Sequence, residues 1–152
     1  MTPMDLLNHA VRAREKSYSP YSNYRVGAAL LGADGQIYTG CNIENAAYPA
    51  TVCAERTALF KGISEGCRAF AALAVVGGPA GTASPNGLGD YAFPCGVCRQ
   101  ALAEFCPPEM PVYLLNDAND VKICTMGDLL PNSFSAASMA RKEDAYADDG
   151  TD

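Results

Sequence analysis

Apolar and polar positions follow two different spacings along the chain, and each spacing predicts one kind of element. Apolar residues at every third or fourth position indicate helices, whereas short runs of β-branched and other apolar residues indicate strands. The pattern predicts helices over 3–16, 52–65 and 95–105, strands over 24–31, 36–43, 69–76, 111–115 and 121–124, and a short helical turn over 126–130.

Turn and cap residues support several of these boundaries. Thr2 and Pro3, followed by Asp5 in the first turn, are typical of a helix start. The strands 24–31 and 36–43 flank a turn at 33–35 and are expected to form a β-hairpin. The stretch 77–91 is rich in glycine and proline and has no periodicity, which predicts a loop.

The order of the elements indicates an α/β fold. The strand 69–76 is a continuous apolar run that needs cover on both faces of its sheet. We therefore predict a three-layer α/β/α sandwich around a mixed five-stranded sheet. A chain of 152 residues is the size of a single domain. We expect this domain to span 1–135, and 136–152 to form an acidic, disordered tail.

Charge and hydropathy exclude several classes of protein. The formal net charge is −6, so the chain has no basic face with which to bind nucleic acid. No apolar run approaches the roughly 18 residues that a membrane span needs, so we predict no contact with a membrane. The N-terminus lacks the pattern of a secretory signal, and a cytoplasmic location is expected.

Cysteines carry the strongest chemical signal. The chain has seven, an odd number that favours metal binding, catalysis or simple burial over a disulfide framework. Cys95 and Cys98 lie three positions apart at the start of a predicted helix, so both sulfur atoms can reach one cation. Cys53, at the start of another predicted helix, is the candidate third ligand. Three protein ligands leave one zinc coordination position for water, which is the arrangement of a catalytic site.

Two charged residues follow Cys53. Three thiolates on Zn²⁺ carry a net charge of −1, and Arg56 is placed to compensate it by donating hydrogen bonds to sulfur. Glu55 is not needed as a ligand and can carry a proton. A lone C-x-x-C is weak evidence, but C-x-E followed by P-C-x-x-C matches the signature of the zinc-dependent nucleobase deaminases.

Longer segments extend this match. The chain closely resembles the small, homotetrameric cytidine deaminases in five segments: SPYSNYRVGAAL (19–30), GCNIENAAYP (40–49), CAERTALF (53–60), PCGVCRQALAEF (94–105) and DLLPNSF (128–134). The resemblance implies a cytidine deaminase-like catalytic domain with one zinc per subunit. It also implies hydrolysis of cytidine and 2′-deoxycytidine to uridine and 2′-deoxyuridine with release of ammonia, as in pyrimidine salvage.

The resemblance also assigns roles to residues. Cys53, Cys95 and Cys98 would hold zinc, and zinc hydroxide would attack C4 while Glu55 moves the proton. Further contacts with substrate are implied for Asn42 and Glu44 at the ribose 3′-hydroxyl, Tyr24 and the backbone of Ala54 at the base, and Tyr48 and Phe134 across subunit boundaries.

Three features depart from the family pattern. Tyr24 replaces a phenylalanine, and Phe93 stands where Ser or Thr usually precedes the Pro-Cys pair. The loop 77–91 is longer than usual. Because the expected contact of Phe93 is made by its backbone carbonyl, we expect the chemistry to survive.

Three alternative functions remain open from the sequence. A blasticidin-type nucleoside deaminase shares the zinc and glutamate motif, although Asn42 and Glu44 favour an unmodified ribose. A structural zinc module would need a fourth ligand, such as Cys67 or Cys106. A deaminase that edits RNA or DNA is disfavoured by the acidic charge.

Overall fold

The computed structural model describes residues 1–139. Its elements are α1 (Pro3–Arg14), β1 (Tyr24–Gly32), β2 (Ile37–Cys41), the 3₁₀ helix η1 (Tyr48–Ala50), α2 (Ala54–Ser64), β3 (Phe70–Pro79), α3 (Gly96–Ala103), β4 (Pro111–Leu115), β5 (Val121–Thr125), α4 (Met126–Leu129) and α5 (Ala136–Met139). Every predicted helix and strand is present within a few residues of its expected bounds.

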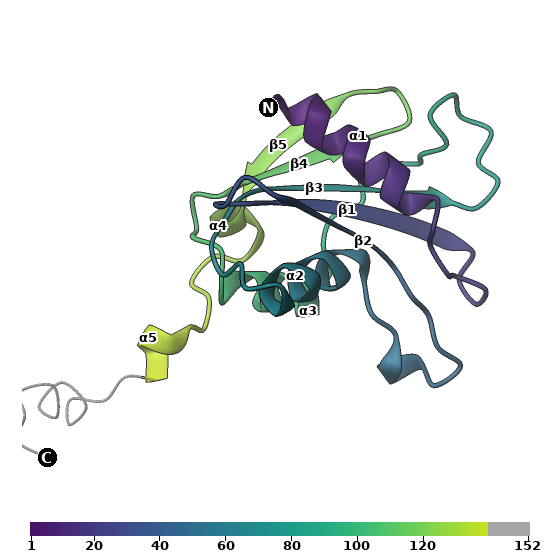
Figure 1. Cartoon of the computed structure of the whole chain (residues 1–152). Coiled ribbons are helices and arrows are strands. Elements are labelled where there is room, and N and C mark those ends of the chain that lie inside the picture. The colour runs from purple at the N-terminus through teal and green to yellow at the C-terminus, as the bar shows by residue number, and fades with distance from the viewer. Residues whose placement is uncertain (140–152) are drawn as a thin grey trace, which may run out of the picture.

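The five strands form one mixed sheet in the order β2-β1-β3-β4-β5. Only β3 and β4 pair in parallel, and the other three pairs are antiparallel. Helix α1 covers one face, whereas α2 and α3 lie on the other (Figure 1). The predicted three-layer α/β/α sandwich is therefore confirmed.

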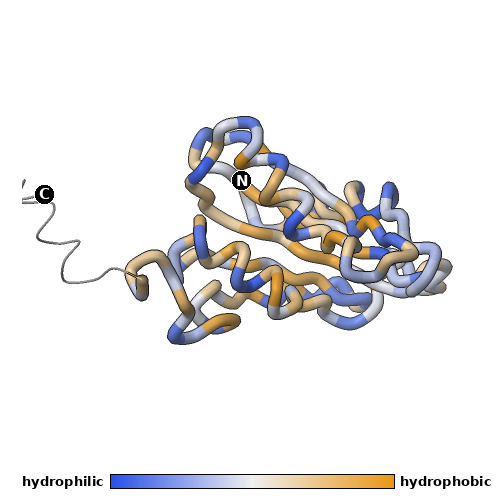
Figure 2. Tube along the Cα trace, turned by 90° about the horizontal axis from the view of Figure 1, so that it is seen from below, coloured by the Kyte–Doolittle hydropathy of each residue, from blue (hydrophilic) through white to orange (hydrophobic). Residues whose placement is uncertain are grey.

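Alternating side chains of β1 build a core on each side of the sheet. Ala28 and Leu30 are fully buried beneath α2 and α3, and Ala29 is fully buried beneath α1. Figure 2 shows hydrophobic stretches along the strands inside the molecule and hydrophilic ones in peripheral loops. Such a two-sided core needs helices on both faces, as the sequence pattern required.

The predicted cap of α1 is also confirmed. The Thr2 hydroxyl accepts a hydrogen bond from Asp5 N at 3.1 Å, and the Asp5 carboxylate accepts one from Thr2 N at 2.8 Å. This capping box satisfies two N–H groups at the start of the helix.

The predicted loop 77–91 begins three positions too early. Gly77, Gly78 and Pro79 belong to β3, where they pair with residues 24–26 of β1. A Cβ on Gly78 would lie 2.5 Å from Gly89 N, so glycine lets the loop pack against the strand. Glycine therefore marks a close backbone approach here, not the end of the strand.

The rest of that loop is attached to the domain. Leu88 is fully buried in the core beneath α1. Asn86 Nδ2 donates hydrogen bonds to Asn116 O at 2.8 Å and to Asn119 Oδ1 at 2.9 Å, in the turn between β4 and β5. The chain thus reaches 91–95 along a defined path.

The predicted tail begins with α5, a four-residue helix. Its remainder lies outside the described residues, so its disorder stays a prediction. Among residues 1–139, the helices are all too short or too polar to cross a membrane.

Candidate active site

Three sulfur atoms meet where two helices begin. Cys53 is the N-cap of α2, Cys95 is the N-cap of α3, and Cys98 lies in the first turn of α3. Their Sγ atoms all lie within 4.8 Å of one another, and those of Cys53 and Cys95 are 3.8 Å apart. Two sulfurs on a tetrahedral zinc ion, each bound at about 2.3 Å, are about 3.8 Å apart. The cluster therefore fits a metal ion of this size.

The charges around the sulfurs also fit a cation. A hydrogen bond from the Cys98 thiol and another from Arg56 lower the pKa of Cys53 well below its usual value. The pKa of Cys98 is raised, because its proton is held against Cys53 and the thiol is buried. Three sulfurs this close cannot all ionise without a positive charge between them, which a divalent metal supplies.

Arg56 supports this arrangement from the side. Its Nη2 lies 3.5 Å from Cys53 Sγ. Its Nε is buried and has no hydrogen-bond partner among the described residues. The Nη2 contact is the hydrogen bond to sulfur that the sequence predicts for Arg56. The N-termini of α2 and α3 add two positive dipole ends at the same place.

Glu55 lies beside the cluster but is not part of it. The residue is in the first turn of α2 and is only 4% exposed. Its burial raises the pKa of the carboxyl group to about 7. A carboxyl group with such a pKa can both take up and release a proton near neutral pH.

These groups line one cavity of about 450 Å³. Its walls include seven of the predicted site residues: Tyr24, Asn42, Glu44, Cys53, Ala54, Glu55 and Cys95. The volume lies in the range of small-molecule sites. The structure thus brings most of the predicted contacts together around one space. Cys98 is fully buried and does not line it, but its Sγ lies within 4.8 Å of those of Cys53 and Cys95.

Asn42 and Glu44 are held firmly in this wall. Asn42 is 8% exposed, and its amide is hydrogen-bonded to the backbone of Tyr24 and Val26. The Glu44 carboxylate accepts hydrogen bonds from Tyr21 N at 2.9 Å and Ser22 N at 3.1 Å. Both side chains are therefore oriented before any ligand arrives.

Comparison with known proteins decides the family. Residues 2–114 match the sequence profile described as the cytidine and deoxycytidylate deaminase zinc-binding region. The chain belongs to this family. Cytidine deaminases of Sporosarcina psychrophila and Halalkalibacterium halodurans are 51% and 50% identical to it over 135 and 134 residues. Those alignments cover 89% and 88% of this chain and 93% and 95% of the relatives.

Solved structures of the family agree with the fold. A crystal structure of cytidine deaminase from Burkholderia pseudomallei superimposes with a TM-score of 0.78 at 47% identity, covering 88% of this chain and all of that one. The enzyme from Mycobacterium tuberculosis superimposes with a TM-score of 0.72 at 35% identity, covering 88% of this chain and 98% of that one. The fold class predicted from the sequence is the fold of this deaminase family.

Zinc is the metal of this family, and the described residues offer three sulfur ligands for it. No fourth cysteine, histidine, aspartate or glutamate joins the group within residues 1–139. Cys67 and Cys106 are buried elsewhere in the core, and burial raises the pKa of Cys106 to about 12. A four-sulfur structural site is therefore not formed by the residues that the structure describes.

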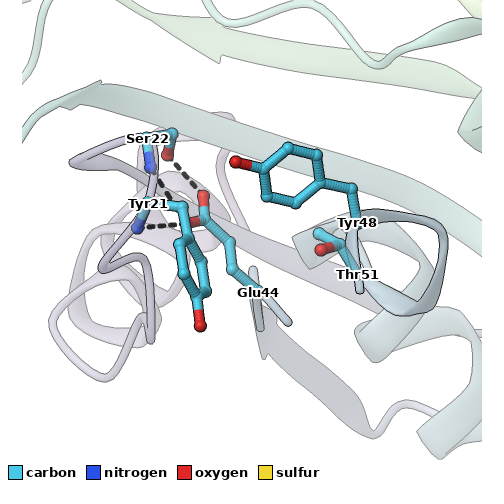
Figure 3. Close-up of a pocket in the computed structure, with 5 residues that line it drawn as sticks. All are labelled: Tyr21, Ser22, Glu44, Tyr48 and Thr51. Atoms are coloured by element: carbon cyan, nitrogen blue, oxygen red, sulfur yellow. Dashed lines mark hydrogen bonds between the residues drawn. The ribbon is translucent and has the colours of Figure 1, made fainter. Parts of the chain in front are cut away.

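Tyr48 and Phe134 lie outside the cavity wall. Tyr48 is 71% exposed and lines a neighbouring hollow of about 380 Å³, together with Tyr21, Ser22, Glu44 and Thr51 (Figure 3). Phe134 is 60% exposed, and its backbone carbonyl accepts a hydrogen bond from Gln100 Nε2 at 2.9 Å. Neither aromatic residue lines the cavity of its own chain.

The sequence missed part of the cavity wall. Tyr91 lines it, and the Tyr91 and Phe93 rings pack edge to face with centroids 6.4 Å apart. Phe93 lines the cavity as well, whereas the sequence predicts a contact only from its backbone carbonyl. In the sequence, only their position just before Pro94 and Cys95 indicates that these two aromatic residues lie near the site.

The structure also accommodates the tyrosine that replaces the usual phenylalanine at position 24. A Cβ on Gly77 would lie 3.0 Å from the Tyr24 hydroxyl oxygen, so the absence of a side chain at 77 makes room for that hydroxyl. Burial raises the pKa of the phenol. Tyr24 therefore presents a neutral ring to the cavity.

Proposed function

We propose that this chain catalyses the hydrolytic deamination of cytidine and 2′-deoxycytidine, giving uridine or 2′-deoxyuridine and ammonia. One observation carries the proposal: a single cavity is lined both by Cys53, Cys95 and Glu55 and by Asn42 and Glu44. The first set suits hydrolysis at a ring carbon, and the second set suits a sugar hydroxyl.

Cys53, Cys95 and Cys98 are the proposed ligands of one zinc ion per subunit. These three sulfurs would hold the zinc, which would supply Lewis-acid chemistry that lowers the pKa of a water molecule. Arg56 donates a hydrogen bond to Cys53 Sγ, and its positive charge favours the thiolate, which is the form that binds metal.

Glu55 is the proposed proton shuttle. It accepts a proton from the attacking water and delivers it to N3 of the pyrimidine, and then helps to protonate the amino group that leaves C4 as ammonia. Water supplies the new C4 oxygen and its hydrogens, so the reaction is balanced without any other reagent. Burial of Glu55 raises its pKa to about 7, which suits this double task.

The remaining contacts orient the nucleoside. Asn42 and Glu44 are proposed to bind the ribose 3′-hydroxyl. Tyr24 lies against the base, and the Ala54 backbone meets the base edge. Buried polar groups of this kind penalise ligands that lack the matching hydroxyl.

Assembly is the second part of the proposal. We infer a homotetramer in which Tyr48 and Phe134 help to complete active sites of neighbouring subunits. Their high exposure in a single chain supports this, because large exposed aromatic residues commonly mark interaction surfaces. The reaction would serve pyrimidine salvage in the cytoplasm.

The test is a direct assay. Purified protein is incubated with cytidine, and uridine and ammonia are measured together, with blasticidin S as a competing substrate. The proposal predicts equal amounts of uridine and ammonia and a strong preference for cytidine. Turnover of blasticidin S alone would assign the site to the antibiotic, and no turnover of either would overturn the proposal.

A further inference from the structure

The side-chain amide of Asn42 has almost all of its hydrogen-bonding capacity in use. Its Oδ1 accepts from Val26 N at 2.9 Å and from the Ser17 hydroxyl. Its Nδ2 donates one hydrogen to Tyr24 O at 2.8 Å. These backbone partners fix which end of the amide is oxygen. What Asn42 can still offer to the cavity is therefore one N–H, a donor.

The Glu44 carboxylate is restricted in the opposite sense. Oε1 accepts hydrogen bonds from Tyr21 N and Ser22 N, and Oε2 accepts one from the Ser22 hydroxyl (Figure 3). These donors hold the pKa of Glu44 below its usual value, and the Ser22 hydroxyl is the largest cause. An ionised carboxylate has no hydrogen to donate, so Glu44 can only accept.

Two serines complete this arrangement. The Ser22 hydroxyl directs its single hydrogen to Glu44 Oε2 and accepts a hydrogen bond from Tyr24 N at 3.0 Å. Ser17 directs its hydroxyl hydrogen to Asn42 Oδ1. Ser22 thus ties the Glu44 carboxylate to the start of β1, which also carries Tyr24. Ser17 occupies Asn42 Oδ1, which could otherwise accept a hydrogen bond from a ligand in the cavity.

We propose that Ser17 and Ser22 are positioning residues that make Asn42 purely a donor and Glu44 purely an acceptor, so that the pair selects a hydroxyl that accepts from one and donates to the other. The inference rests on the proposed function, in which this pair binds the ribose 3′-hydroxyl. A 3′-phosphate ester has no hydroxyl hydrogen for Glu44 and would place negative charge beside it. The directions of these hydrogen bonds therefore disfavour a ligand that is esterified at this hydroxyl.

Substrate analogues test the direction of these hydrogen bonds with the wild-type protein. A 3′-fluorine accepts weakly and cannot donate, so it leaves Glu44 unpaired just as 3′-deoxycytidine does. We expect kcat/KM for both analogues to fall by about 10- to 100-fold relative to cytidine, as for a lost hydrogen bond to a charged group. Turnover of the 3′-fluoro analogue at the rate of cytidine would overturn the assigned direction.

Variants at position 22 test the positioning of Glu44. Ser22→Ala should lower kcat/KM for cytidine by about 5- to 10-fold, mostly through KM, because one of the hydrogen bonds that hold Glu44 is lost. It should lower kcat/KM for 3′-deoxycytidine less than for cytidine, since that substrate cannot use the Glu44 contact and is affected only through the hydrogen bond that Tyr24 N loses. Ser22→Thr keeps the hydroxyl and should restore the preference.

Ser64→Ala is the matched control. Ser64 is exposed, and its hydroxyl donates to Lys61 O at 3.0 Å at the end of α2, outside the cavity wall. This variant should leave both substrates unaffected. Equal losses for both substrates in Ser22→Ala would overturn the positioning role while leaving the proposed function in place. No uridine from wild type and Ser64→Ala would overturn the proposed function itself, and the inference with it.

Discussion

The sulfur atoms of Cys53 and Cys95 lie 3.8 Å apart, although 42 positions separate the two residues in the chain. Each residue is the N-cap of a helix on the same side of the sheet. The metal ligands therefore sit on rigid elements that are packed against the core, and this placement fixes them before a metal binds.

Removal of one ligand should remove metal and activity together. Cys95→Ala leaves two sulfurs, and we expect zinc content measured by atomic absorption to fall from one per chain to nearly none, with loss of cytidine turnover. Cys106→Ala, which truncates a buried thiol outside the cluster, should keep its zinc. A fully loaded, active Cys95→Ala protein would show that the ligand set is wrong.

Cobalt substitution should report three sulfurs and one exchangeable ligand. The charge-transfer bands from thiolate to cobalt would correspond to three sulfurs, and the ligand-field bands should shift when a nucleoside inhibitor enters the cavity. A spectrum of four sulfurs that is insensitive to nucleosides would indicate a structural site.

The long loop before the third helix should contribute to stability. Leu88 is fully buried, so Leu88→Ala should lower the free energy of unfolding in urea by about 2 to 5 kcal/mol. Met4→Ala truncates a side chain that is 37% exposed and should cost less than about 1 kcal/mol. Equal, small effects of both changes would mean that the loop does not pack as described.

Much of the site was predictable from the sequence because its chemistry is local. The C-x-E and P-C-x-x-C motifs each start a helix, and helix starts have clear sequence signals. Asn42, Glu44 and Tyr24 followed from the resemblance. The bounds of the hairpin strands were close as well, since apolar runs and the turn at 33–35 define them.

The remaining features depend on contacts between distant segments. The sequence predicts a loop at Gly77 and Gly78, yet both are strand residues. Because they lack side chains, the Tyr24 hydroxyl can pack against Gly77 and the backbone of Gly89 against Gly78. Tyr91 reaches the cavity because Asn86 and Leu88 direct the loop, and no periodicity reveals that path. Ser17 and Ser22 act through side chains more than 20 positions away.

Phe134 should matter to a neighbouring subunit. An aromatic contact with the neighbour's pyrimidine is worth about 0.5 to 1.5 kcal/mol, so Phe134→Ala should raise KM by roughly 2- to 10-fold. A chain truncated after 135 is the control for Phe134→Ala. It keeps Phe134 and should retain its activity and its oligomeric state, as measured by sedimentation. Unchanged kinetics and assembly for Phe134→Ala would show that each subunit's site is complete without it.

The most direct test of the central claim is to measure zinc content and cytidine turnover on one preparation of Glu55→Gln. Glu55 is not among the clustered ligands, so the variant should bind one zinc per chain as the wild type does. Loss of the proton shuttle should lower kcat by at least about 10²-fold. A variant that keeps both its zinc and wild-type turnover would contradict the mechanism, and a variant that loses its zinc would contradict the assignment of Glu55 as a residue outside the metal site.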